Sequence, residues 1–129
     1  MPDMTENADI KWSDTSHSPE IRAERREGDV IEFDLFVDAK LFQFQGHFPN
    51  EPVLPGVAQI DWAVRLGREH FDLSGTITRL GQLKFSKLIV ADSQILLRLE
   101  WNEEKQRLLF SYKEGEETCS SGFFELTAQ

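Results

Sequence analysis

Residues 56–71 read GVAQIDWAVRLGREHF, the one long stretch of the chain in which apolar residues recur at helical spacing. Pro55 suits the first turn of a helix, because no intrahelical acceptor awaits the N–H group that proline lacks. Asp72 and Gly75 follow as residues that end helices. We therefore predict a single long helix over residues 56–71. Val57, Ile60, Val64 and Phe71 recur at helical spacing, and Ala58, Ala63 and Gly67 keep parts of its surface narrow.

The segments on both sides of this helix alternate apolar and polar residues, which is the pattern of half-buried strands. Before the helix, residues 20–28 are mostly charged and predict an edge strand at best, whereas residues 31–37 alternate regularly. Four further strands are expected after the helix, over residues 77–90 with a bend at Gly81, 94–101, 106–112 and 118–126. An antiparallel sheet with one helix packed on a single face is the simplest α+β fold for this order.

The chain has 129 residues, which is enough for one domain with its own core but not for two. We expect residues 1–18 to be a flexible acidic leader and residues 19–129 to form a single domain. The net charge of −9 argues against a nucleic-acid surface, because phosphate binding needs clustered Lys and Arg. No apolar run approaches the roughly 20 residues that span a bilayer, and no signal peptide is evident. Since Cys119 is the single cysteine, these features favour the cytoplasm.

The loop before the helix, residues 46–56, combines the parts of an acid/base site for a carbonyl compound. It places His47 in a segment stiffened by three prolines, and a neutral imidazole can accept a proton at pH 7. The helix N-terminus offers unpaired N–H groups and a partial positive charge, which suit an oxygen that becomes negative during reaction. Gly56 would let a ligand approach that backbone closely. A purely structural interpretation, a rigid connection with a structural His, competes with this one.

Asp61, one to two turns into the helix, has two possible roles. An ordinary Asp with a pKa near 3.9 is protonated in about one molecule per thousand at pH 7. A general acid needs that pKa to rise by about 3, which corresponds to about 4 kcal/mol and which burial can supply. Otherwise Asp61 stays ionised and orients a water molecule or holds the imidazolium.

The segment Gly46-His47-Phe48-Pro49, with Pro52-Val53-Leu54-Pro55-Gly56-Val57 and Asp61, closely resembles the motif of 3-hydroxyacyl-[acyl-carrier-protein] dehydratases of fatty acid synthesis. In that family an acidic residue lies fourteen positions after the His, as Asp61 does in this chain. The flanks, residues 19–22 and 59–63, look more like the dehydratase-like proteins of aryl polyene gene clusters. The resemblance implies a hot-dog fold, with an antiparallel sheet wrapped around one central helix, and chemistry without a cofactor.

The resemblance also implies a role for each matched residue. His47 would remove the proton at C2 of a (3R)-hydroxyacyl thioester, and Asp61 would assist loss of the 3-hydroxyl as water, leaving a trans-2-enoyl thioester. The backbone N–H of Gly56 would bind the thioester carbonyl, and the carbonyl of Val53 would orient the imidazole. Three more positions are expected to contact substrate: Phe48, Val57 and Trp62. In this family His and acid meet across a dimer interface, so a homodimer or a heterodimer with a related hot-dog subunit is implied.

Two departures from the family pattern concern the same region. Asn50 replaces the usual Gly after His-Phe-Pro, and Arg65 stands one turn beyond the acid where the family usually has Gln. If Arg65 points at Asp61, it would keep the carboxylate ionised and weaken the general-acid role.

Acyl carrier proteins are acidic, so an acidic enzyme that binds one needs a local basic patch. Four cations are candidates for carrier docking, although scattered solvated charges fit equally well: Arg65, Arg68, Lys84 and Lys87. No His, Cys and carboxylate spacing suggests a metal site.

Two alternative functions stay open at this point. A hot-dog thioesterase would also place a carboxylate on the central helix, but such hydrolases usually lack the His47-Phe48-Pro49 string. A non-catalytic subunit that binds carrier or completes a heterodimer would not need both His47 and Asp61.

Overall fold

The computed structural model describes residues 18–38 and 53–127 of the chain. The expected leader therefore lies almost entirely outside the described residues. Within them, two strands precede one long helix and four strands follow it. In chain order the elements are β1 (Glu20–Glu27), β2 (Val30–Val37), α2 (Gly56–Phe71), β3 (Ile77–Phe85), β4 (Ser93–Asn102), β5 (Arg107–Glu114) and β6 (Glu117–Leu126). The predicted α+β order and the bounds of the helix are confirmed.

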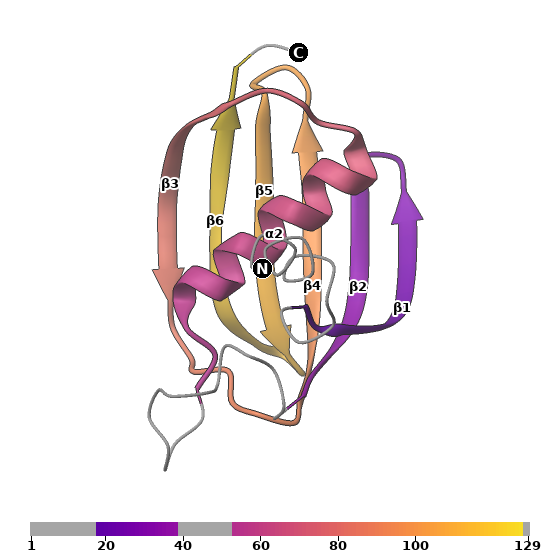
Figure 1. The fold of residues 1–129 in the computed structure, drawn as a ribbon, viewed down its shortest axis with the longest axis vertical. Coiled ribbons are helices and arrows are strands. Elements are labelled where there is room, and N and C mark those ends of the chain that lie inside the picture. Colours follow the sequence, from indigo (N-terminus) through magenta and orange to yellow (C-terminus); the bar gives the residue numbers. More distant parts are fainter. Residues whose placement is uncertain (1–17, 39–52, 128–129) are drawn as a thin grey trace, which may run out of the picture.

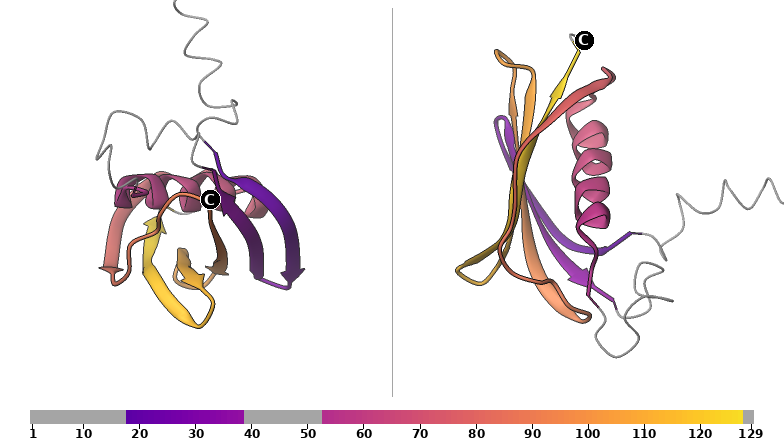
Figure 2. Two further views of the ribbon diagram at one scale, coloured as in Figure 1. Left: turned by 90° about the horizontal axis from the view of Figure 1, so that it is seen from below. Right: turned by 90° about the vertical axis from the view of Figure 1, so that its left-hand side faces the viewer.

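The six strands form one antiparallel sheet in the order β1-β2-β4-β5-β6-β3. Helix α2 crosses one face of this sheet diagonally, from the lower end of β3 towards the hairpin of β1 and β2 (Figure 1). The sheet curves around the helix, as the end-on view in Figure 2 shows. This is the hot-dog arrangement that the sequence resemblance implied. Among the described strands, β1 and β3 form the two edges of the sheet.

Small residues let α2 lie close to the sheet. Ala58, Ala63 and Gly67 face the strands, and a Cβ at position 67 would collide with the side chain of Leu108. The helix ends where Asp72 adopts a left-handed conformation with φ 56°, and its N–H bonds to the Arg68 carbonyl. Large apolar side chains from the strands fill the space beneath the helix, among them Phe33, Leu97, Leu99 and Phe124.

Strand β3 is shorter than predicted, because it ends at Phe85 and not at Val90. The bend expected at Gly81 is a bulge, with a register shift against β6 between Gly81 and Lys84. A Cβ at Gly81 would collide with the ring of Phe123. Glycine at this position therefore leaves space for that ring. Beyond the strand, Val90 forms an isolated bridge with Val53. Residues 89 and 90 still make strand-like backbone pairs, but with the segment before the helix and not with β6. The strand-like sequence pattern therefore extends beyond the end of β3.

In the part of the chain that the structure describes, no helix is both long and apolar enough to span a bilayer.

Candidate active site

The described part of the predicted site is the first half of α2 and the segment that leads into it, residues 53–55, which is called the lead-in. His47 and Phe48 lie outside the described residues, as does Asn50. The other predicted site residues fall within one continuous stretch and are placed by the structure: Val53, Gly56, Val57, Asp61, Trp62 and Arg65.

The start of α2 presents backbone N–H groups that the helix itself does not use. The Pro55 carbonyl accepts the N–H groups of Ala58 and Gln59, at 3.0 and 3.2 Å. By helix geometry, the N–H groups of Gly56 and Val57 have no acceptor within the helix. The first turn contains no acidic side chain that would neutralise the positive end of the helix dipole. The position is suited to a substrate oxygen that gains negative charge.

Gly56 is needed for a close approach, and the neighbour is a side chain of the same protein. A Cβ at this position would lie 2.9 Å from Cε1 of Phe85, at the end of β3. Glycine therefore allows the helix start to pack against that ring. The Val57 side chain beside it is 73% exposed. The helix start is thus supported on one side and open on the other.

Asp61 forms an ion pair with Arg65, the residue that departs from the family pattern. Arg65 Nε donates to Asp61 Oδ2 at 2.9 Å, and Arg65 Nη1 donates to Ser18 Oγ at 3.2 Å. The Asp61 side chain is 37% exposed in the single chain. The condition that weakens the general-acid role is met.

Trp62 points into the core and is 1% exposed. It also borders a cavity of about 340 Å³ between the helix and the start of β1, together with Ser18, Pro19, Ile21, Arg65, Leu66 and Glu69.

A buried polar cluster under the first turns of α2 escaped sequence analysis. Gln59, Tyr112 and Ser120 are 3%, 0% and 0% exposed. The Tyr112 hydroxyl donates to the Gln59 carbonyl oxygen at 2.7 Å, and the Ser120 hydroxyl donates to Gln59 Oε1 at 2.6 Å. Burial raises the pKa of the Tyr112 phenol well above its usual value, and the negative charge of Asp61 adds to the rise. The available signal was a glutamine on the sheet-facing side of an apolar helix.

The four cations predicted to dock a carrier differ in their surroundings. Arg65 pairs with Asp61, and Arg68 Nη1 donates to the Gly75 carbonyl at 2.8 Å. Lys87 lies between Glu114 and Glu117, at 3.0 and 2.8 Å, and its pKa is raised by the hydrogen bonds to these carboxylates. Lys84 is exposed on the edge strand β3, and none of the described carboxylates pairs with it.

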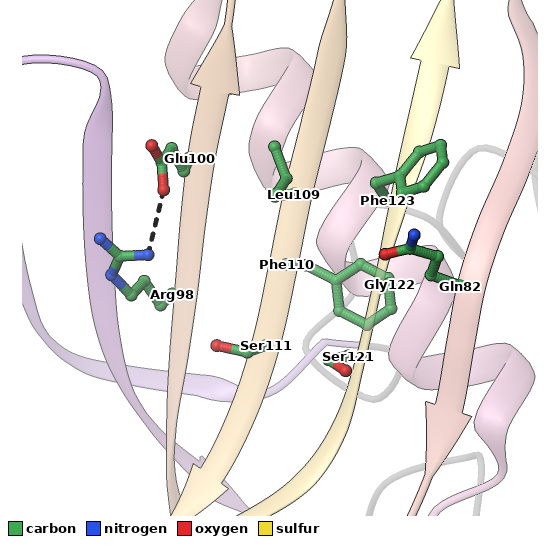
Figure 3. Close-up of a pocket in the computed structure, with 9 residues that line it drawn as sticks. All are labelled: Gln82, Arg98, Glu100, Leu109, Phe110, Ser111, Ser121, Gly122 and Phe123. Carbon is green, nitrogen blue, oxygen red and sulfur yellow. Dashed lines mark hydrogen bonds and ion pairs between the residues drawn. The ribbon is translucent and has the colours of Figure 1, made fainter.

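A cavity of about 230 Å³ lies on the outer face of the sheet, which the helix does not cover (Figure 3). An ion pair between Arg98 Nη1 and Glu100 Oε1, at 3.2 Å, borders it. None of the predicted site residues lines this cavity, and the sheet separates it from the start of α2. Among the described residues, no three His, Cys, Asp or Glu side chains gather as metal ligands.

Comparison with known families gives one match that spans most of the chain. The profile of a family described as ApeI-like, ApeI dehydratase, matches residues 23–123. Among curated proteins, the 3-hydroxyacyl-[acyl-carrier-protein] dehydratase FabZ of Erythrobacter litoralis is 32% identical over 95 residues, which cover 66% of this chain and 63% of the relative. A second FabZ, from Clostridium novyi, is 38% identical over 64 residues, which cover 44% of this chain and 45% of the relative. The chain spans less than two thirds of the length of these curated relatives.

Two solved structures resemble the whole described fold. The dehydratase heterocomplex ApeI:P from Xenorhabdus doucetiae contains a chain with a TM-score of 0.80 and 30% identity, over 84% of this chain and 97% of that one. An uncharacterised protein from Erwinia carotovora subsp. atroseptica gives a TM-score of 0.74 and 34% identity, over 85% and 96%. The fold described above is therefore shared almost from end to end with these two proteins.

Proposed function

Because the chain belongs to the ApeI-like dehydratase family, we propose that it dehydrates (3R)-hydroxyacyl thioesters on an acyl carrier protein to trans-2-enoyl thioesters. The pathway would be fatty acid or polyene-type acyl chain synthesis. The observation that carries the proposal is one helix that has an open N-terminus at Gly56, for the site of its own chain, and a partly exposed carboxylate at Asp61, for the site shared with a second chain. An elimination needs both an anion-stabilising group and a polar group for the departing hydroxyl.

The elimination removes a proton from C2, breaks the C3–O bond and delivers a proton to the departing hydroxide. The neutral imidazole of His47 takes the proton from C2, and the electrons of that C–H bond first move towards the thioester carbonyl. They then form the C2=C3 double bond as the C3–O bond breaks. Negative charge develops on the thioester oxygen during this step. The N–H group at Gly56 and the positive end of the helix dipole stabilise that oxygen. Val53 lies in the lead-in and forms a β-bridge with Val90. Its carbonyl oxygen would orient the imidazole.

Asp61 acts in this proposal as a carboxylate that orients the 3-hydroxyl and the departing water. The hydrogen bond from Arg65 Nε to Asp61 Oδ2, at 2.9 Å, supports this role. The hydroxide that leaves C3 must still receive a proton. The imidazolium formed at His47 supplies it, so the protons balance without a neutral Asp61.

A second hot-dog subunit is expected at the β3 edge. Exposed apolar side chains gather on β3, just after it and at the start of α2: Val57, Leu80, Leu83, Phe85, Leu88 and Val90. A large exposed apolar patch of this kind is typical of an interface. The opposite edge, β1, carries the charged sequence EIRAERRE, and charged edges resist pairing. We expect the partner to be a second copy of this chain or a related subunit. The partner residue that corresponds to His47 would then lie close to Asp61.

A mass-spectrometric assay tests the proposed reaction. The protein is incubated with a 3-hydroxyacyl thioester on a carrier protein, and with the same acyl group on pantetheine. Loss of water from the acyl group is expected on both. Release of the free acid would instead indicate a thioesterase, and an unchanged acyl group would indicate a binding subunit; either result contradicts the proposal.

Carrier docking is expected to depend on Lys84, because an exposed cation that pairs with none of the described carboxylates can attract an acidic protein. The Lys84→Glu variant should raise KM for carrier-bound substrate by about three- to tenfold, with KM for the pantetheine thioester unchanged. Lys105→Glu makes the same charge change in the turn between β4 and β5, at the far end of the sheet, and serves as the control. Lys84 lies on the edge strand where the second subunit is expected, so equal effects on both substrates, or loss of the dimer, would argue against docking at Lys84.

A further inference from the structure

The amide side chain of Gln59 faces the sheet beneath the start of α2. The buried residues of the helix are Ala58, Gln59, Trp62, Ala63 and Gly67, and Gln59 is the one with a side-chain amide. A buried amide is costly unless its donor and acceptor are both satisfied. In this protein both are used, and both partners lie outside the helix.

Gln59 joins three separate segments of the chain. Its Oε1 accepts the hydroxyl of Ser120 on β6, and its Nε2 donates to the carbonyl oxygen of Leu54 at 3.3 Å. Its backbone carbonyl accepts the hydroxyl of Tyr112 on β5. The side chain therefore ties the lead-in to the sheet, whereas the bond from Tyr112 ties only the helix to the sheet.

The two backbone groups of Leu54 control the peptide planes on both sides of it. The Leu54 N–H donates to the Ile89 carbonyl at 2.7 Å. Because a trans peptide is planar, this bond also sets the direction of the Val53 carbonyl. The bond from Gln59 holds the next plane, between Leu54 and Pro55. Pro55 in turn is extended, with φ −61° and ψ 149°, and is followed directly by Gly56.

Resting on the proposed function, we propose that Gln59 is a positioning residue of the dehydratase site. Through the Leu54 carbonyl it holds the lead-in and the first helical turn, so that the Gly56 N–H points at the thioester oxygen. Gln59 touches neither substrate nor the reacting atoms. Its effect on rate follows from geometry, since a displacement of about 1 Å at a reacting group can cost about a hundredfold in rate.

The test compares Gln59→Leu with Tyr112→Phe. Leucine has a similar volume but leaves the Leu54 carbonyl and the Ser120 hydroxyl without this partner. Tyr112→Phe removes a buried hydrogen bond to the same residue and leaves the lead-in untouched. We expect Gln59→Leu to lower kcat by about tenfold or more with KM within about twofold of wild type. We expect Tyr112→Phe to keep kcat within about twofold of wild type.

Two further measurements separate positioning from general stability. Amide hydrogen exchange over residues 53–58 should accelerate in Gln59→Leu and stay as in wild type in Tyr112→Phe. In Gln59→Glu, a protonated carboxyl can both donate to Leu54 and accept from Ser120, whereas an ionised carboxylate cannot donate. The ratio of Gln59→Glu activity to wild-type activity should therefore rise as pH falls.

The outcomes are distinct. Wild-type kcat and exchange in Gln59→Leu would overturn the proposal, and so would equal losses in Gln59→Leu and Tyr112→Phe with exchange raised throughout the chain. If Gln59→Leu does not fold, Ser120→Ala carries the same prediction, because it releases the other end of the Gln59 amide. If the wild-type protein dehydrates no thioester, the proposed function fails. In that case the rate of amide hydrogen exchange over residues 53–58 in Gln59→Leu still decides whether Gln59 holds the start of the helix.

Discussion

Coexpressed His47→Ala and Asp61→Asn chains are expected to recover about a quarter of the wild-type dehydratase activity, as a statistical mixture of two-fold dimers. Each variant alone should lose about two to four orders of magnitude in kcat, because in the proposed mechanism each removes a group that handles a proton or the departing water. The recovery follows from a site shared between two chains. In a mixed dimer, one site combines the intact His47 of one chain with the intact Asp61 of the other.

The measurement is the rate of enoyl thioester formation after the two variants are coexpressed with different tags and the mixture is purified. Asp61→Asn paired with itself serves as the control, since no arrangement of its chains restores the carboxylate. If the coexpressed pair is as inactive as the control, His47 and Asp61 do not meet between two copies of this chain. Because the wild-type chain is active by itself in this comparison, that result would place the His47 and Asp61 of one site in the same chain.

Replacing Phe33 by alanine is expected to lower the free energy of unfolding by about 3–5 kcal/mol. Phe33 lies on β2, inside the sheet, and is 0% exposed. Its ring packs edge-on to His70 at a centroid distance of 4.9 Å, so it supports the end of α2. Alanine leaves a cavity that the neighbouring β1 and β4 strands cannot close without breaking their register with β2.

Urea unfolding followed by circular dichroism measures this loss, at one protein concentration because assembly couples stability to concentration. The matched control is Leu109→Ala on the outer face of the sheet, where the side chain is 39% exposed, with an expected cost below about 1 kcal/mol. Similar losses for the two variants would mean that the space between helix and sheet is not the main core.

The helix was predictable because its signals are local. Pro55, the apolar spacing and Asp72 all lie within or beside the element, and the predicted bounds agree with the structure. The pairing of Arg65 with Asp61 was foreseeable for the same reason, because residues four apart share a helix face. The end of β3 was predicted wrongly, since the pairing of Val90 with Val53 is invisible in the strand pattern itself.

The Gln59 cluster could not be predicted, because its partners Tyr112 and Ser120 lie 53 and 61 residues further along the chain. Local periodicity carries no information about such contacts. The docking candidates show the same limit. Lys84 and Lys87 look alike in the sequence, yet the β5–β6 hairpin brings Glu114 and Glu117 to Lys87. Charge spacing along the chain does not reveal which cations are neutralised by distant strands.

The two edges of the sheet differ, and this difference limits how far the sheet can grow. A sheet with two adhesive edges would add subunits at both ends and form a filament. In this protein most of the exposed apolar side chains gather at β3, while the Arg and Glu side chains of β1 face the solvent at the other end. In the proposed dimer, the apolar β3 edges of both subunits would be buried against each other. The joined sheet would then expose only the charged β1 edge at each end. Assembly along the sheet would therefore stop at two subunits.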